Sequence, residues 1–311
     1  MIEALEPFRV ELTGYCYRML GSGFEAEDAV QETLVRAWKA YATYDAQRAS
    51  LRTWLYRIAT NICIDMLRSS QRRALAVDLR EPGGPLDTPL HERVFVQPVP
   101  DALVLPEDQA VLRDTVRLAF VAALQLLPPR QRAVLVLRDV LAWQASEVAA
   151  LLSVSVPAVT SALQRARATL KVTDPGTPLH PEDPAQRALL NRYCDAFERH
   201  DVEALVALLH EDATMSMPPF AWWLRGRPQV AEALRDPAAS CAGAWLVPVA
   251  ANGSPAYWQM RPGLAEPFGL VFLDVRDGLV TGIVTYLGVS ALLPLFGCTP
   301  DSSAGPARTS S

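Results

Sequence analysis

The chain has 311 residues, of which 50% are apolar and 20% charged, and its formal net charge is −5 at pH 7. This composition predicts two or three globular domains and excludes a chain that coats nucleic acid along its whole length. Five cysteines and four histidines are widely scattered without a CxxC or HExxH motif, so we expect reduced cytosolic thiols, no metal site and no cofactor. The first residues lack the basic and apolar segments of a signal peptide.

Basic side chains are concentrated in two segments. Residues 48–73 hold six arginines against the single carboxylate of Asp65, and residues 110–172 hold seven arginines and Lys171 against three acidic residues. Residues 174–311 are net acidic. Because nucleic acid attracts concentrated positive charge, the two basic segments are the candidates for contact with DNA.

Residues 25–41 form the first strongly predicted helix, in a domain that we expect to cover residues 1–73. Ser22 and Glu25 fit a capping box at the start of this helix. Apolar side chains at helical spacing predict a core face made of Val30, Leu34, Ala37, Trp38 and Tyr41.

Residues 51–68, LRTWLYRIATNICIDMLR, predict a second helix with two contrasting faces. The buried face is expected to contain Leu55, Ile58, Ala59, Ile62 and Met66. The opposite stripe contains Trp54, Arg57, Asn61, Asp65 and Arg68. An aromatic ring beside amide, carboxylate and guanidinium groups suits unpaired bases, which offer stacking surfaces and free hydrogen-bonding edges. For this segment taken alone, an ordinary solvated helix face is the alternative.

Residues 74–107 contain six prolines and a Gly-Gly pair, which predict an extended linker with little structure of its own. Helical patterning resumes at Glu107, breaks at Pro128 and Pro129 and then continues, so residues 108–172 are expected to form a second all-α domain.

Within that domain, residues 146–170 show a helix-turn-helix pattern, with Ser146 and Ser155 as predicted N-caps and a turn at Ser153–Ser155. In the second helix the inward positions are Val159, Leu163, Ala166 and Leu170. The outward and flanking positions are Thr160, Ser161, Gln164, Arg165, Arg167 and Ala168. In a major groove, Gln pairs with adenine and Arg with guanine or phosphate. A generic basic helical hairpin is the alternative.

A second Pro-rich linker covers residues 173–185, and the pattern beyond it changes from helices to strands. This order predicts an α+β domain with an antiparallel meander over residues 186–298, followed by a compositionally disordered tail at 299–311. The uncharged run 278–298 is long enough for a membrane span, but its β-branched residues and Pro294 favour a buried strand and a turn. We therefore expect no membrane association.

Residues 5–73 and 108–171 resemble the two conserved domains of the extracytoplasmic-function sigma factors of the sigma-70 superfamily. The motifs that carry the resemblance are EAEDAVQETLVRAW, LRTWLYRIATNICIDMLR, LPPRQRAVLVLRDV and SVPAVTSALQRARATL. It implies a cytoplasmic protein, not an enzyme, with two all-α sigma domains (region 2 and region 4) that binds promoter DNA and core RNA polymerase at the β′ clamp helices and the β flap.

The same resemblance assigns roles to residues of this chain. Polymerase binding falls to Asp28, Gln31, Glu32, Arg36 and Trp38, with Trp38 open to a role as core instead. The loop Thr43–Ser50 would capture and open the −10 element together with Trp54, Arg57, Asn61, Asp65 and Arg68. The −35 element would be read by Thr160, Ser161, Gln164, Arg165 and Arg167.

Residues 186–297 resemble the cone-shaped SnoaL-like domain of the nuclear transport factor superfamily, through HEDATMSMPP, WWLRGRP, ANGSPAYW and VRDGLVTGIVTYLG. Such cones serve as enzymes, ligand binders or interaction modules, so the fold does not decide the function. A small apolar ligand would occupy a pocket lined by Tyr193, Met217, Trp222, Trp223, Tyr257, Trp258 and Phe272, each of which could equally be core. His210, Glu211 and Asp212 are candidates for a catalytic site by residue type only, and we assign no catalytic residue.

Three functions stay open on the sequence. The leading one is a sigma factor whose C-terminal cone regulates it in cis. The second is a helix-turn-helix regulator that works without polymerase, and the third is a SnoaL-type enzyme fused to a DNA-binding scaffold. The acidic first helix and the Trp54 stripe favour the first, because a reader of duplex DNA needs no surface for unpaired bases.

Overall fold

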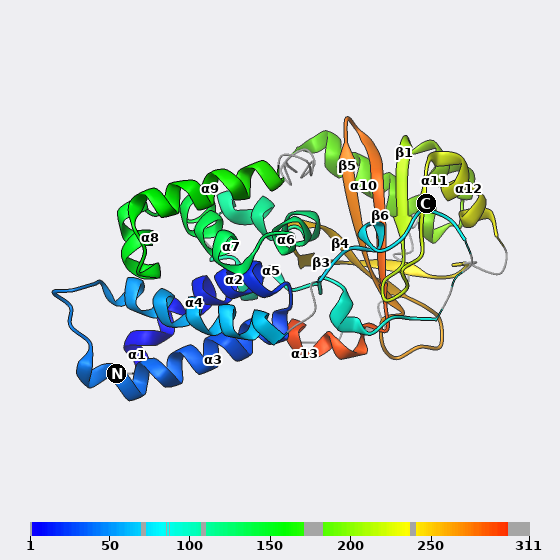
Figure 1. Cartoon of the computed structure of the whole chain (residues 1–311). Helices are drawn as coiled ribbons and strands as arrows, with labels where there is room; N and C mark the ends of the chain where they lie inside the picture. The colour runs from blue at the N-terminus through cyan, green and yellow to red at the C-terminus, as the bar shows by residue number, and fades with distance from the viewer. Residues whose placement is uncertain are drawn as a thin grey trace. The chain divides into compact units, whose positions relative to one another are not determined.

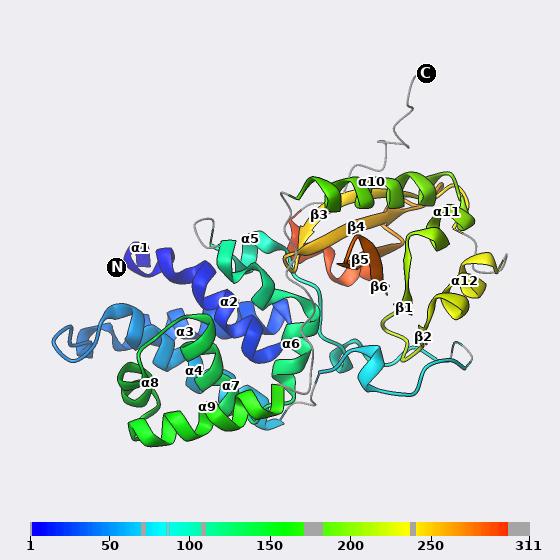
Figure 2. The ribbon, with the colours of Figure 1, turned by 90° about the horizontal axis from the view of Figure 1, so that it is seen from above.

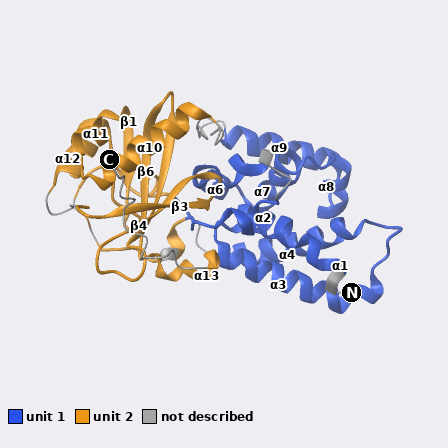
Figure 3. Cartoon of the chain, turned by 180° about the vertical axis from the view of Figure 1, so that it is seen from behind, with its two compact units in different colours: residues 1–74, 96–175 blue, residues 75–95, 176–311 orange. Residues whose placement is uncertain are grey.

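The computed structural model describes residues 2–69, 73–84, 86, 88–106, 110–170, 183–236 and 241–297. Figures 1 and 2 show its elements from two sides, and Figure 3 shows that the chain divides into two compact units. Unit 1 comprises residues 1–74 and 96–175, and unit 2 comprises residues 75–95 and 176–311. The predicted linker 74–107 is therefore not an independent spacer, since residues 75–95 belong to the same unit as the C-terminal domain.

In its described residues, unit 1 is helical. Its first part contains α1 (Ile2–Leu5), α2 (Arg9–Leu20), α3 (Gly23–Ala40) and α4 (Leu51–Ser69). Its second part contains α5 (Asp101–Val104), α6 (Leu118–Gln125), α7 (Pro129–Leu135), α8 (Ala145–Leu152) and α9 (Val156–Leu170). Helix α2 is central, because every residue from Leu12 to Leu20 is buried and the helix packs against α3, α4, α5 and α6.

Helix α3 begins near the predicted position. The Ser22 hydroxyl accepts a hydrogen bond from the Glu25 backbone N–H at 3.3 Å, which confirms the N-cap half of the capping box. The Glu25 carboxylate instead accepts a hydrogen bond from Arg73 Nη2 at 2.7 Å, and Arg73 is buried. This pair ties the start of α3 to the residues that follow α4.

The predicted core face of α3 is partly wrong. Val30 and Ala37 are buried, but Trp38 is 51% exposed. The buried stripe consists mainly of small side chains, namely Ala26, Ala29, Val30, Thr33 and Ala37. Small side chains let α2 approach α3 closely, and the bulky indole of Trp38 lies outside that contact.

Helix α4 matches its predicted range, and its buried face is wider than predicted. Leu55, Ala59 and Ile62 are buried as expected, and Tyr56, Thr60 and Cys63 are buried as well. A hydrogen bond of 2.8 Å joins the Tyr15 and Thr60 hydroxyls, so the buried hydroxyl of Thr60 is paired across α2 and α4.

The continuous helix predicted from Glu107 to the Pro128 break is instead a 3-10 helix over Ala110–Val116 followed by α6. The reason is a buried arginine on α2. Arg18 is 1% exposed and donates hydrogen bonds to Thr115 Oγ1 at 2.7 Å and to the Gly14 carbonyl at 2.7 Å. Burial lowers the pKa of Arg18 to about 10. The Thr115 hydroxyl, turned towards Arg18, holds the tighter 3-10 turn in place.

Unit 2 joins helices to a six-stranded sheet. Its helices are α10 (Pro184–Glu198), α11 (Val202–Ala207), α12 (Arg227–Arg235) and α13 (Leu293–Phe296). Its strands are β1 (Leu209–Ser216), β2 (Trp223–Arg225), β3 (Trp245–Ala251), β4 (Ser254–Met260), β5 (Gly269–Arg276) and β6 (Leu279–Leu287). Helix α10 lies along one face of the sheet (Figure 2).

The sheet order is β2-β1-β6-β5-β4-β3, with β3 to β6 as the predicted antiparallel meander and β1 parallel to β6. Strand β2, only three residues long, was missed by the sequence pattern. Residues 279–287 form a strand inside the sheet, as expected for the uncharged run. Within the described ranges no single helix is long and apolar enough to cross a membrane. Only α8 and α9 taken together reach that length and apolar character, and they are bent by 101° relative to each other.

Candidate nucleic-acid interface and ligand cavity

The predicted −10 surface lies on one side of α4. Arg57, Asn61, Asp65 and Arg68 are exposed, and Arg68 pairs with Asp65 at 2.9 Å. Trp54 is half-buried, and its ring lies beside that of Tyr44, with 5.0 Å between the two ring centroids. The structure therefore holds the indole in an aromatic cluster at the start of α4, next to the loop Thr43–Ser50.

The predicted −35 surface lies on α9. Ser155 Oγ accepts from the Ala158 N–H at 3.4 Å, and Ser153 adopts the left-handed conformation (φ 54°) that the turn requires in place of glycine. Val159, Leu163 and Ala166 are buried as predicted. The five candidate reading residues are all exposed: Thr160, Ser161, Gln164, Arg165 and Arg167.

Two details of this motif differ from the prediction. Ser146 is not the N-cap, because α8 already starts at Ala145 with Gln144 as its N-cap, and Glu147 Oε2 accepts from the Gln144 N–H at 2.7 Å. The ion pair of Arg167 was not predicted either: its guanidinium makes two hydrogen bonds to Asp139, of 2.7 and 2.8 Å. The hydrogen bond to Asp139 raises the pKa of Arg167.

Unit 1 packs α4 against the helix-turn-helix. Arg57 Nη2 donates to the Ala150 carbonyl at 2.8 Å, and the ring of Tyr56 lies 5.0 Å from that of Trp143. The guanidinium of Arg52 also lies over the Trp143 ring, at 5.2 Å. In this arrangement Arg57, which is one of the side chains predicted to capture bases, is hydrogen-bonded to a backbone carbonyl of α8.

The predicted polymerase surface is an exposed stripe on α3. Asp28, Gln31, Glu32, Arg36 and Trp38 all face solvent, and Arg36 pairs with Glu32 at 2.6 Å one helical turn away. The outward position of Trp38 removes the alternative that it is a core residue. An exposed indole beside acidic side chains is typical of a contact surface.

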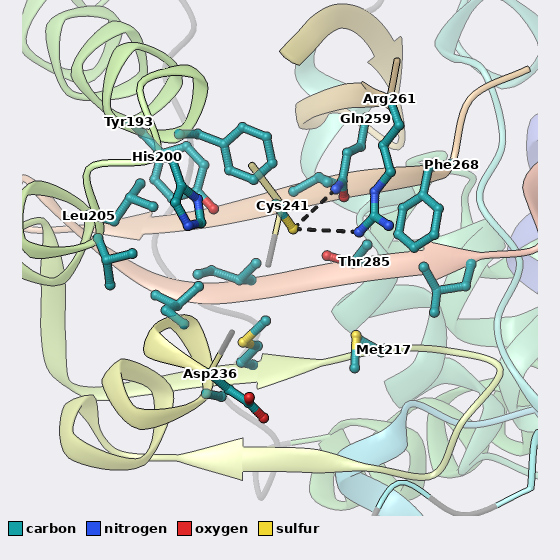
Figure 4. Close-up of a pocket in the computed structure, with 18 of the residues that line it drawn as sticks. Tyr193, His200, Leu205, Met217, Asp236, Cys241, Gln259, Arg261, Phe268 and Thr285 are labelled. Atoms are coloured by element: carbon teal, nitrogen blue, oxygen red, sulfur yellow. Dashed lines mark hydrogen bonds between the residues drawn. The ribbon is translucent and has the colours of Figure 1, made fainter. Parts of the chain in front are cut away.

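Unit 2 contains a cavity of about 570 Å³ between α10, α12 and the sheet (Figure 4). Of the residues predicted to line it, Tyr193, Met217 and Trp222 do so. Leu86, from the predicted linker, lines it as well. This volume lies within the range of about 300–1,000 Å³ that small-molecule sites occupy.

The other predicted lining residues are core. Trp223 packs with Ala76 and Phe95, Phe272 packs against Tyr286 at 5.9 Å, and Trp258 packs against Phe296 at 4.9 Å. Tyr257 belongs to the core cluster beneath α10. Strand alternation sends successive residues to opposite faces, and the sequence alone does not show which face borders the cavity.

The candidate catalytic residues lie elsewhere. Glu211 and Asp212 are exposed on β1, and none of His210, Glu211 and Asp212 is among the residues that line the cavity. Gln259 and Arg261, with the ring of Phe268 beside them, form a polar end of the cavity that was not predicted from the sequence. Gln259 Nε2 and Arg261 Nη2 lie 3.4 and 3.8 Å from Cys241 Sγ, and the Arg261 guanidinium lies 3.5 Å from the Phe268 ring centroid (Figure 4). The available signal was a Gln and an Arg two residues apart at the end of an apolar strand.

Residues 75–95 are bound to the rest of unit 2 by backbone and side-chain hydrogen bonds. Trp223 Nε1 donates to the Arg80 carbonyl at 2.7 Å, and the Gly83 N–H donates to the Trp223 carbonyl at 2.8 Å. The Leu90 N–H donates to the Pro219 carbonyl at 2.8 Å. We call residues 75–95 the strap. Along the chain it follows Ala74 and precedes Val96, which both belong to unit 1.

Comparisons with known proteins agree with this organisation. Residues 5–73 match Sigma-70 region 2, residues 117–170 match Sigma-70 region 4, and residues 190–282 match the SnoaL-like domain. The ECF RNA polymerase sigma factor SigG of Mycobacterium tuberculosis is 44% identical over 310 residues, covering 96% of this chain and 83% of the relative. The chain belongs to the ECF RNA polymerase sigma factors.

Another relative of this family is SigJ of Mycobacterium tuberculosis, which is 30% identical over 215 residues, 69% of this chain and 64% of that protein. The crystal structure of SigJ has the same fold, with a TM-score of 0.61, 24% sequence identity and 99% of both chains covered. The chain is therefore a sigma factor that acts in promoter recognition and transcription initiation, with a SnoaL-like C-terminal domain. A helix-turn-helix regulator independent of polymerase is not favoured, and the relatives are initiation factors rather than enzymes.

Proposed function

We propose that three surfaces divide the work of this sigma factor. The exposed stripe of α3 docks on the β′ clamp helices of core polymerase, α4 captures unpaired bases of the −10 element, and α9 reads the −35 element as duplex. The observation that carries the proposal is that the candidate side chains of all three helices are exposed, apart from the half-buried Trp54, while the opposite faces are buried.

For the −10 element, the aromatic cluster of Tyr44 and Trp54 supports base capture. Stacking of one base on an aromatic side chain contributes about 1–3 kcal/mol and tolerates any base. The exposed amide of Asn61, about two helical turns beyond Trp54 on the same side of α4, then supplies hydrogen bonds to a base edge.

On α9, Arg167 differs from the other candidates for the −35 element because it forms an ion pair. Its guanidinium is already oriented by Asp139, so we assign it a phosphate or positioning contact. Gln164 and Arg165 are exposed, and we assign base recognition to them.

The contact between Arg57 and Ala150 supports a closed form of unit 1. Arg57 must leave the Ala150 carbonyl before it can contact DNA, so binding to polymerase and promoter requires α4 to separate from α8. We propose that the described packing is the polymerase-free form and that docking of α3 on polymerase favours the open one.

The strap supports control in cis by the SnoaL-like domain. Its hydrogen bonds to Trp223 and Pro219 restrain the chain segment that connects the two DNA-binding parts of unit 1. We propose that this restraint favours the closed form. The SnoaL-like domain then acts through its cavity as a binding module rather than as a catalyst.

Run-off transcription with the full chain and core polymerase tests the cis control. Trp223→Phe removes the N–H donor to Arg80 and keeps an aromatic ring, which costs the strap contact about 1 kcal/mol. We expect transcription to rise by up to about fivefold at limiting sigma factor. Trp245→Phe is the matched control, because the buried Trp245 Nε1 has no hydrogen-bond partner within the described residues. Equal output from both variants and the unchanged protein would contradict the cis control.

A further inference from the structure

The polar end of the unit 2 cavity holds a cation without a matching anion. Arg261 Nε is buried and makes no hydrogen bond within the described ranges, where no carboxylate pairs with this guanidinium. Its contacts there are the Phe268 ring and the weakly accepting sulfur of Cys241. The residue as a whole is half-buried, and even partial burial of a charge is costly unless the charge is paired and hydrogen-bonded.

The neighbouring polar groups favour an anion at this end. Gln259, which is 3% exposed, directs its Nε2 towards Cys241 beside Arg261, and Thr285 lies on the same side of the cavity (Figure 4). The amide and hydroxyl groups supply donors next to the guanidinium. Among the described residues that line the cavity, the one carboxylate is that of Asp236, which lies away from Arg261.

The rest of the lining is mainly apolar and adaptable. Tyr193, Phe197, Met215, Met217 and Trp222 come from three parts of the fold, and methionine side chains adjust to varied shapes. Since a water molecule occupies about 30 Å³ of liquid, a cavity of about 570 Å³ has room for fewer than about twenty non-hydrogen atoms.

We propose that this cavity binds an amphipathic carboxylate with a single apolar tail, its head group on Arg261 and Gln259. The tail lies among the aromatic and methionine side chains. Leu86 of the strap lines the cavity and is 51% exposed. An apolar tail in the cavity covers this side chain, and the buried apolar contact stabilises the packing of the strap against the rest of unit 2. The ligand thereby becomes a co-repressor of the sigma factor, and this last step rests on the proposed cis control.

Isothermal titration calorimetry with the full chain tests the ligand class. The probes are decanoate, its neutral isostere decanamide and the cationic decylamine, which share one tail. We expect decanoate to bind at least tenfold more tightly than the other two. In Arg261→Gln that preference should disappear while decanamide still binds, which shows that the cavity is intact. Arg225→Gln removes an exposed arginine of β2 outside the cavity and should keep the preference.

The outcomes are distinct. Equal affinity for decanoate and decanamide, tighter binding of decylamine, no binding of any probe, or an unchanged preference in Arg261→Gln would each overturn the ligand assignment. Run-off transcription then tests the coupling, since decanoate should lower the output of the full chain and leave Arg261→Gln unaffected. Calorimetric binding of decanoate without a transcriptional change upholds the ligand assignment and counts against the cis control.

Discussion

Replacement of Arg165 by alanine tests the assignment of α9 to the −35 element. Arg165 is exposed, and within the described part of the chain no carboxylate pairs with it, so its guanidinium can make a bidentate contact with guanine. Such a contact discriminates between bases by about 1–3 kcal/mol, which corresponds to about 5- to 150-fold in Kd. Arg165→Ala should therefore weaken binding to the cognate −35 sequence by that factor and relax the preference at one base pair.

The matched control lies two residues further along the same helix. Arg167→Ala removes the same charge, but from a guanidinium that Asp139 already holds. We therefore expect a similar loss of binding affinity on all DNA sequences, and a slope of log K against log salt concentration that is lower in magnitude by about one. The assay is fluorescence anisotropy of the polymerase complex on cognate and −35-substituted promoter duplexes over a range of salt. If Arg165→Ala weakens both duplexes equally, the reading face of α9 is wrongly assigned.

Three further predictions concern single side chains. Asn61→Ala should impair strand opening more than closed-complex binding in permanganate footprinting, and equal loss of both would indicate a structural role. Arg18→Met removes the donors to Gly14 and Thr115 and should lower the free energy of unfolding by about 1–3 kcal/mol in urea titrations, whereas an unchanged midpoint would contradict its structural role. Burial raises the pKa of Cys194 to about 11, and only the thiolate form of the side chain reacts with iodoacetamide. The rate of Cys194 alkylation should therefore rise about tenfold per pH unit from pH 8 to 10. A rate that levels off by pH 9 in peptide mass spectra would refute this.

Much of the helical architecture could be predicted because its signals are local. Ser22 and Ser155 cap helices through hydrogen bonds to residues three positions away, and the inward face of α9 follows from spacing alone. Trp38 was misplaced because the spacing rule treats every apolar residue alike. The contact between α2 and α3 is made by small side chains, and the indole of Trp38 lies outside it. This arrangement depends on how the two helices pack together, so it cannot be predicted from the sequence of either helix alone.

The cavity was harder to predict because its lining depends on which face of each strand is covered. Trp222 and Trp223 are adjacent, yet one lines the cavity and the other packs with Ala76 and Phe95. Its polar end needs contacts between residues 241, 259, 261 and 268, and no local pattern brings these together. The resemblance to SnoaL-like cones predicted an apolar pocket of this kind but not the cation in its wall.

The strap shows why a segment with the composition of a linker need not act as one. Prolines and glycines leave residues 75–95 few hydrogen bonds of their own, so their backbone N–H and carbonyl groups are available to a partner. Trp223 and Pro219 supply that partner in unit 2, and the ring of Trp223 covers the apolar side chains of Ala76 and Phe95. Both ends of the strap continue into unit 1, so under the proposed control in cis a change in its contacts with the rest of unit 2 would alter the freedom of the two DNA-binding parts to separate. In that proposal the SnoaL-like domain acts on initiation through the strap, and its cavity needs no contact with DNA.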